Sequence, residues 1–229
     1  MSNLRVGMIV PPAGDQVPPE ATEIYPSGID FFAKSLSISS VSAEAFDVAL
    51  QGLVEAIEAL SSHDPDVVSM MGTSISFYHG WEGHERLLER MRVAAGEVPV
   101  TTMADAVVKG LRKVGARNVA VGCAYHQDLE TRLHSFVTEA GFNVVAAERM
   151  DLTNVGRVLS VDTEEIVALG DKLHASAPEA DAMLISCGGL RTLGATKILE
   201  EKHGVPVISS AVAGVVDAVE VGRSKHADR

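Results

Sequence analysis

Short apolar segments alternate with longer segments of mixed polarity along most of the chain. Apolar runs bounded by Gly, Pro, Ser or Thr are typical of buried strands, whereas apolar residues spaced three or four apart are typical of helices. Regular alternation of the two predicts an α/β fold in which parallel sheets are covered by helices. The predicted strands cover residues 5–10, 66–71, 98–101, 118–122, 142–147, 182–187 and 205–209. The predicted helices cover residues 42–61, 80–95, 104–114, 128–140, 163–175, 190–203 and 211–221.

Three segments fit neither period. Residues 13–40 are rich in Pro, Gly and Ser and predict a long loop, which in a compact domain often acts as a lid or a binding loop. Residues 150–161 also predict a loop, and the polar residues 222–229 predict a frayed tail. Helix ends are marked by Ser42, a predicted N-cap, by Asp162 or Thr163 as another, and by Gly115 as a stop signal.

The pattern restarts near the middle of the chain, which indicates an internal repeat. Val67–Ser74 resembles Ala182–Gly189, because both run from an apolar strand into a turn of small residues. Val98–Thr102 resembles Val205–Ser209 in the same way. The first predicted strand, at residues 6–10, likewise resembles the one at 119–122.

The repeat predicts two pseudo-symmetric halves, residues 1–114 and 115–221, each a parallel four-stranded sheet flanked by helices. The last helix is expected to pack back onto the first half. In parallel sheets, ligands bind beyond the carboxyl ends of the strands, so the strand ends of two such halves are expected to face each other across a cleft.

The charge balance narrows the range of partners. The 229 residues carry a formal net charge of −12 with a pI near 5.0, which argues against nucleic acid and anionic membranes. Two cysteines are too few for a disulfide framework. Neither a signal peptide nor an apolar stretch of about 18 residues is apparent. We expect a cytoplasmic protein, a monomer or weak oligomer, that acts on a small molecule.

Two predicted turns carry the candidate chemistry. Cys187 and Gly188 end one strand, and Thr73 and Ser74 end its counterpart in the other half. Tyr125 follows a third strand. Together they would supply one thiol, three hydroxyls and several backbone N–H groups, with no Lys or Arg in the turns. Such neutral donors suit the binding of a carboxylate and the stabilisation of charge that develops on it.

Each of these residues also has a plain structural interpretation. A cysteine beside a tight turn is often simply buried, threonine and serine often cap helices, and tyrosine often packs with its hydroxyl at the rim. The protonation of Cys187 stays open, because a following helix lowers a thiol pKa whereas a bound carboxylate raises it.

No metal site or cofactor site is predicted. His79, His84, His126 and His134 do not form a ligand set, and Cys123 stands apart from them. The chain contains no dinucleotide-binding glycine fingerprint, no P-loop and no serine nucleophile elbow.

Five segments taken together resemble one enzyme group. They are residues 7–12, 68–78, 124–125, 185–190 and 205–207. The combination is similar to the arylmalonate decarboxylases of the aspartate/glutamate racemase superfamily, to which maleate cis–trans isomerases are related. The resemblance covers about residues 6–219.

The resemblance implies a specific activity. Members of the superfamily generally use two cysteines, one from each half, and here Gly72 occupies the first position while Cys187 occupies the second. This one-thiol arrangement implies cofactor-free, asymmetric decarboxylation of a disubstituted (aryl)malonate to a chiral monocarboxylic acid. An enediolate would be held in a dioxyanion hole formed by Thr73, Ser74, Tyr125 and Gly188, with Cys187 as proton donor.

The resemblance also implies a substrate pocket, in which one carboxylate would lie against apolar side chains. Its residues are Pro11, Ile38, Val41, Phe46, Gly72, Ile75, Val155, Val158 and Gly189. Core packing is the alternative role for several of them. Two other functions remain open: a racemase or cis–trans isomerase of small dicarboxylates or amino acids, and a carboxylate-binding protein without catalysis.

Overall fold

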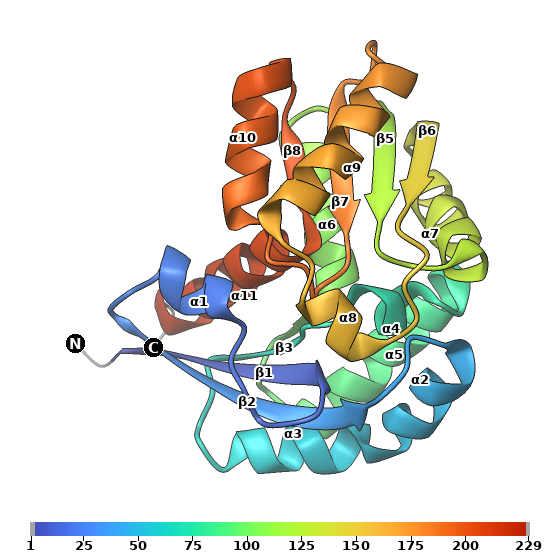
Figure 1. Cartoon of the computed structure of the whole chain (residues 1–229). Helices are drawn as coiled ribbons and strands as arrows, with labels where there is room; N and C mark the ends of the chain where they lie inside the picture. Colours follow the sequence, from blue (N-terminus) through green and yellow to red (C-terminus); the bar gives the residue numbers. More distant parts are fainter. Residues whose placement is uncertain (1–2, 228–229) are drawn as a thin grey trace.

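The structure, a computed structural model, describes residues 3–227. Its strands are β1 (Leu4–Pro12), β2 (Ile29–Ile38), β3 (Val67–Met70), β4 (Val100–Thr102), β5 (Asn118–Cys123), β6 (Asn143–Arg149), β7 (Ala182–Ser186) and β8 (Val207–Ser209). They form two four-stranded sheets with the orders β2-β1-β3-β4 and β6-β5-β7-β8, and all neighbouring strands run parallel. Each sheet is the centre of one lobe (Figure 1).

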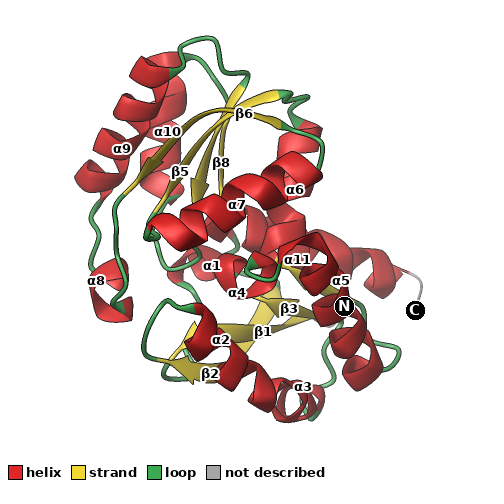
Figure 2. Ribbon diagram, turned by 90° about the vertical axis from the view of Figure 1, so that its right-hand side faces the viewer, coloured by secondary structure: helices red, strands yellow, loops and turns green. Residues whose placement is uncertain are grey.

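Helices cover both sheets. They are α1 (Pro19–Ile24), α2 (Ala43–Ala49), the 3₁₀ turn η1 (Leu50–Gly52), α3 (Leu53–Ser61), α4 (Thr73–Phe77), α5 (Gly80–Ala95), α6 (Met103–Lys113), α7 (Gln127–Glu139), α8 (Val155–Leu159), α9 (Thr163–Ser176), α10 (Leu193–His203) and α11 (Ser210–Ala227). One face of the first sheet packs against α3 and α5, and the other against α11. The short helices α4 and α8 lie between the lobes in both ribbon views (Figures 1 and 2).

The identical strand orders confirm the predicted repeat and the α/β fold with two halves. The symmetry extends to a side-chain detail at the start of the sheets. Asp66, just before β3, accepts a hydrogen bond from the backbone N–H of Arg5 at 2.9 Å. Asp181, just before β7, accepts hydrogen bonds from the N–H groups of Arg117 and Asn118 at 3.0 and 2.7 Å. Each aspartate thus satisfies N–H groups that the neighbouring strand leaves unpaired at its first residues.

Helix α11 follows the second sheet in the chain but packs on the first, as the sequence predicted. Its Val215, Ala218 and Val219 belong to the same apolar cluster as Val6 and Val67 of β1 and β3. A Cβ atom added at Gly222 would lie 3.0 Å from Val67, so the helix approaches the sheet closely there. The red helix crosses beneath the second lobe and ends beside β1 (Figure 1).

The predicted loop at residues 13–40 is wrong for much of its length. It contains α1 and the ten-residue strand β2, which pairs only with β1 and is therefore an edge strand. Most residues of β2 are partly exposed, so the strand lacks the apolar alternation that would reveal it. A short helix, α8, likewise interrupts the predicted loop at 150–161.

Three helix boundaries also differ from the prediction. The helix expected at residues 42–61 is interrupted by η1, although Ser42 caps its first part as predicted. Helix α10 starts at Leu193 rather than 190. Helix α11 continues to Ala227, so residues 222–227 are helical rather than a frayed tail, and residues 228–229 lie outside the described part of the chain.

Other predicted ends agree with the structure. Asp162 is the N-cap of α9 and forms a capping box with Glu165, and Gly115 follows α6 with a positive φ of 72°.

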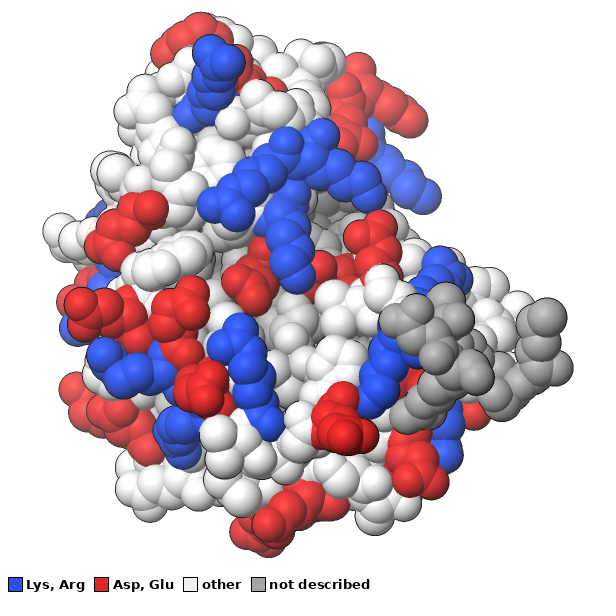
Figure 3. Space-filling view, turned by 180° about the vertical axis from the view of Figure 1, so that it is seen from behind, with Lys and Arg blue, Asp and Glu red and all other residues white. Residues whose placement is uncertain are grey.

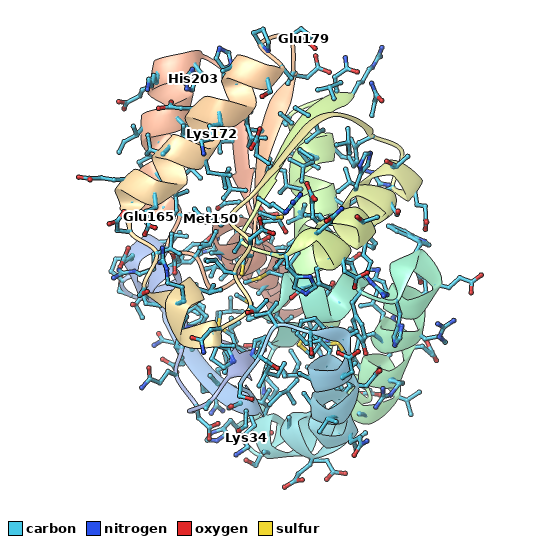
Figure 4. The ribbon with its side chains drawn as sticks, turned by 45° about the vertical axis from the view of Figure 1, so that its right-hand side comes forward. Lys34, Met150, Glu165, Lys172, Glu179 and His203 are labelled. Carbon is cyan, nitrogen blue, oxygen red and sulfur yellow. The ribbon has the colours of Figure 1, made fainter. Side chains whose placement is uncertain are left out.

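The charged side chains lie mostly on the outer surface. Figure 3 shows Lys and Arg interspersed with Asp and Glu over one face of the molecule. Figure 4 places Lys34 at the far edge of the first lobe and Glu179 at the far end of the second. Among residues 3–227, no helix combines the length and apolar content that crossing a membrane requires.

The attachment of α11 predicts a difference between two acidic residues of that helix. Asp217 is buried and accepts hydrogen bonds from the Thr101 hydroxyl and from Lys109 Nζ, whereas Glu220 pairs with Lys113 on the surface at 3.2 Å. Asp217→Ala should lower the free energy of unfolding by about 2–3 kcal/mol, because it leaves a buried hydroxyl unpaired. Glu220→Ala should cost less than about 1 kcal/mol. Urea unfolding measures both, and equal losses would contradict this account of how α11 is held.

Candidate active site

A cavity of about 290 Å³ lies where the carboxyl ends of the two sheets meet. Its wall is formed by the segment after β1, the turn between β3 and α4, helix α8 and the turn after β7. The lining residues are Val10–Gly14, Gln16–Glu20, Ile38, Val41, Phe46, Met71–Ser74, Val155, Val158, Leu159 and Cys187–Arg191. Both predicted turns therefore open into one cavity.

Cys187 stands at the end of β7, with its side chain in the cavity wall and 8% of the residue exposed. Burial raises the pKa of its thiol to about 11, although hydrogen bonds from the backbone of Gly189, the Tyr125 hydroxyl and the backbone of Leu190 act in the opposite direction. Five residues, Gly188–Thr192, lie between Cys187 and the first residue of α10, so the helix does not start directly after the thiol as the sequence predicted. A pKa this far above neutral favours the protonated thiol at neutral pH, and its largest cause is burial, which the sequence did not show.

The opposite turn runs from β3 into α4. Gly72 precedes the helix, Thr73 is its first residue, and both line the cavity together with Ser74. The Thr73 side chain is buried and its Oγ1 donates to Met103 Sδ at 3.4 Å. A Cβ atom at Gly72 would lie 2.5 Å from Pro11 Cγ, so the close approach of that proline requires glycine.

Gly188 brings the two turns into contact. A Cβ atom there would lie 2.6 Å from Met103 Sδ and 3.0 Å from the carbonyl oxygen of Met71. Both neighbours belong to the first lobe. The missing side chain therefore allows the backbone after Cys187 to lie directly against the backbone that leads to Thr73.

Tyr125 is buried beneath the cavity rather than exposed in its wall. Its hydroxyl lies 3.4 Å from Ser186 Oγ and is hydrogen-bonded to the Cys187 thiol and to the Thr73 side chain. Burial raises its pKa well above the usual value, and the nearby Cys187 adds to this, so the phenol remains a hydrogen-bond donor at neutral pH. Its ring packs edge-on against Phe77 at 5.8 Å.

Comparison with known proteins identifies the family. A profile of the arylmalonate decarboxylase family matches residues 6–228 of the chain. The arylmalonate decarboxylase of Bordetella bronchiseptica is 40% identical over 216 residues, which cover 94% of this chain and 89% of that protein. The chain belongs to the arylmalonate decarboxylase family. It is therefore a carboxy-lyase, and the resemblance inferred from its motifs is confirmed.

Solved structures agree with this assignment. One is the liganded form of an arylmalonate decarboxylase variant, in which one glycine is changed to cysteine and one cysteine to serine. It superposes with a TM-score of 0.93 at 39% sequence identity, and the alignment covers 96% of this chain and 93% of that one. A cysteine-to-serine variant of the maleate cis–trans isomerase from Nocardia farcinica, with a covalently bound succinylcysteine intermediate, has a TM-score of 0.88 at 20% identity, with the same coverage. The second similarity shows a shared fold.

Most of the residues that the sequence assigned to the pocket of this decarboxylase-family chain do line the cavity. They are Pro11, Ile38, Val41, Phe46, Gly72, Val155, Val158 and Gly189. Ile75 is different. It lines a separate cavity of about 250 Å³ together with Tyr78 and Arg90, and it approaches the main site only through its Cγ2, which is 2.7 Å from the position of a Cβ at Gly72.

The sequence analysis did not predict two charged side chains that line one end of the cavity. Glu20 of α1 is buried, lines the cavity and accepts a hydrogen bond from the backbone N–H of Thr192 at 3.2 Å. Burial raises the pKa of its carboxyl. Arg191 also lines the cavity and pairs with Glu23. Arg191 therefore adds a cationic side chain to a cavity for which only neutral donors were predicted, and Glu20 was not predicted because α1 lies in the segment predicted as a loop.

Two of the four histidines named above form hydrogen bonds outside the main cavity. His84 is buried and bonds the Thr102 hydroxyl at 2.9 Å, and His79 lies 3.1 Å from Asp47. In the part of the chain that the structure describes, no group of three His, Cys, Asp or Glu side chains is arranged to hold a metal ion.

The raised pKa of Cys187 predicts how fast its thiol reacts. Because only the thiolate is nucleophilic, alkylation by iodoacetamide should be slow at pH 7 and rise about tenfold per pH unit up to about pH 10 without a plateau. The measurement uses a Cys123→Ser variant, so that mass spectrometry reports one site. A plateau near the ordinary thiol value of about 8.5 would contradict the proposed protonated state.

Proposed function

We propose that this protein decarboxylates a disubstituted malonate, with an aryl group as the larger substituent, to a chiral monocarboxylic acid without a cofactor. The observation that carries the proposal is a single protonated thiol, Cys187, on the wall of a cavity whose opposite turn offers Thr73 and Ser74. The family membership supports the reaction class.

The two carboxylates of the substrate would occupy different surroundings. The retained carboxylate would accept hydrogen bonds from the hydroxyls of Thr73 and Ser74 and from backbone N–H groups around Ser74 and Gly188. Tyr125, which is buried behind the cavity wall, would support this dioxyanion hole from the second lobe through its hydrogen bonds to Cys187 and Thr73. Neutral donors held in fixed positions stabilise negative charge without reorganising during the reaction.

The other carboxylate would lie against Ile38, Val41, Phe46, Val155 and Val158, which line the same cavity. Water is scarce beside such side chains, so an ionised carboxylate is poorly solvated there. Breaking its bond to the α-carbon releases neutral CO2, and the electron pair moves onto the retained carboxylate as an enediolate.

Cys187 would then transfer its proton to the α-carbon. Because the thiol lies on one side of the cavity, the proton reaches one face of the planar intermediate, which gives a single enantiomer. The resulting thiolate takes a proton from water, so each turnover consumes one proton and releases one CO2. The high pKa of the buried thiol favours the protonated form that this step requires.

Isomerisation or racemisation is the second candidate function, and one observation bears on it. Two-base chemistry needs a second acid on the opposite turn, where this chain has Gly72 tightly packed against Pro11. Cys123 does not supply it, because it is buried in β5 and does not line the cavity within the described residues.

The decisive experiment incubates EDTA-dialysed protein with phenylmalonate and with maleate, and follows CO2 and fumarate separately. We expect CO2 from phenylmalonate and no fumarate. Cys187→Ala should reduce CO2 release about 100- to 10,000-fold, the usual contribution of general acid catalysis. Cys123→Ser serves as the matched control and should retain activity. Undiminished CO2 release by Cys187→Ala would remove the thiol from the mechanism.

A second thiol at position 72 tests the steric account of the site. Gly72→Cys alone should give slow exchange of the α-proton of 2-phenylpropanoate in D2O, because its Cβ would clash with Pro11 Cγ at 2.5 Å. Adding Pro11→Ala and Ile75→Val relieves the contacts with Pro11 Cγ at 2.5 Å and Ile75 Cγ2 at 2.7 Å and should speed the exchange about tenfold, since overpacking of this kind costs about 1–3 kcal/mol. NMR measures the exchange. Wild-type exchange at a comparable rate would instead favour the racemase.

A further inference from the structure

A buried methionine lies directly behind the predicted dioxyanion hole. Met103 is the first residue of α6, is fully buried and is absent from the described residues that line the cavity. Its side chain lies beside Gly188 and Gly214, where an added Cβ would approach it to 2.6 Å in both cases. It therefore contacts the turn that follows Cys187 and the helix α11 as well as Thr73.

The contact with Thr73 has a defined direction. Thr73 Oγ1 lies 3.4 Å from Met103 Sδ, and a thioether carries no hydrogen, so the hydroxyl is the donor. A hydroxyl has one proton to donate. While Thr73 donates to Met103, it cannot also donate to a bound carboxylate.

We propose that Met103 is a positioning residue, which holds the Thr73 hydroxyl in the unliganded enzyme and releases it to the substrate carboxylate. This inference rests on the proposed function in one respect, namely that a carboxylate binds at Thr73. Met103 touches no substrate, and it acts only through the threonine.

Because the acceptor is the thioether sulfur of Met103, the Thr73 hydroxyl can readily exchange it for a substrate carboxylate. A buried hydroxyl without any acceptor is destabilising, and the Thr73 side chain is 2% exposed. A thioether is a weak acceptor, whereas a hydrogen bond to a carboxylate is about twice as strong as one between neutral groups. The thioether therefore satisfies the hydroxyl at rest but competes poorly with the ligand. A carbonyl oxygen in its place would hold the proton more firmly.

This exchange predicts opposite effects for two substitutions of Met103. Leucine removes the thioether acceptor from the unliganded state and leaves the Tyr125 hydroxyl as the other partner of Thr73, so Met103→Leu should bind a carboxylate more tightly. Glutamine introduces a strong acceptor that must be given up on binding, so Met103→Gln should bind it more weakly. A purely structural role would weaken binding in both variants, because both disturb the packing around Gly188.

The experiment measures the dissociation constant of phenylacetate, an unreactive monocarboxylate, by calorimetry on the full-length protein. We expect about two- to fivefold tighter binding by Met103→Leu and about tenfold weaker binding by Met103→Gln, in line with the net strength of one hydrogen bond. Met91→Leu is the matched control, since Met91 is fully buried in α5 away from the cavity. It should leave the dissociation constant unchanged.

A double-mutant cycle locates the effect at the threonine. In a Thr73→Val background the hydroxyl is absent, so both Met103 substitutions should lose their effect on phenylacetate binding. In wild type carrying ¹³C-methyl methionine, phenylacetate should shift the Met103 methyl resonance, and in Thr73→Val this shift should disappear. If Met103→Gln fails to fold, two measurements still test the positioning role. They are the direction in which Met103→Leu changes the dissociation constant of phenylacetate, and the shift of the Met103 methyl resonance.

Two failures can be told apart. Binding shifts of the same sign in both Met103 variants, or shifts that persist in Thr73→Val, would overturn the positioning role even if wild type releases CO2 from phenylmalonate. Opposite shifts that vanish in Thr73→Val would support it even if no CO2 is released, in which case the proposed reaction alone falls. Absence of phenylacetate binding by wild type would overturn the positioning role.

Discussion

The site depends on the close approach of two backbone turns from different sheets. Gly188 packs against the carbonyl oxygen of Met71 and the sulfur of Met103, at distances that leave no room for a Cβ atom. Any side chain at position 188 would push the turns apart, and the cavity would lose the convergence of the thiol and the hydroxyls. The arrangement of the proposed site therefore depends on the missing side chain of Gly188, because the contact between the turns fixes the positions of the surrounding hydrogen-bond donors.

Burial at this boundary also sets the chemistry of the thiol. Cysteines that act as nucleophiles have lowered pKa values, in settings rich in positive charge or at helix ends. Cys187 lies in the opposite setting, since its burial outweighs the hydrogen bonds it receives from Gly189, Tyr125 and Leu190. In the proposed reaction this cysteine would therefore act as an acid rather than as a nucleophile. Burial also raises the pKa of the neighbouring Tyr125 hydroxyl, so the phenol keeps its proton as well.

The sequence allowed the repeat, seven of the eight strands and the two turns of the site to be predicted, because most of these segments are apolar, short and bounded by small residues. Strand β2 was not predicted, because it is partly exposed along its length and its sequence therefore shows no alternation of apolar and polar residues. Glu20 was missed because α1 lay inside the predicted loop, and Arg191 was missed because residue 190 was predicted to start a helix, whereas the turn after β7 continues to α10 at Leu193. Met103 carried no signal at all: its contact with Thr73 joins residues thirty positions apart, and only the packed structure brings them together.

The path of α11 has a consequence for access to the cavity. This helix is connected to the second sheet but lies on β1 and β3, where Asp217 is bound by Thr101 and Lys109. The two lobes can therefore move apart only if α11 loses its apolar contacts with β1 and β3. The other part of the cavity wall that faces solvent is the segment from Ala13 to Pro19, whose residues are largely exposed and which is attached to β2 by the hydrogen bond from the Ser35 N–H to Asp15. Access to the cavity thus depends on this short segment, whereas the turns that carry Thr73 and Cys187 are held by the packing of both lobes.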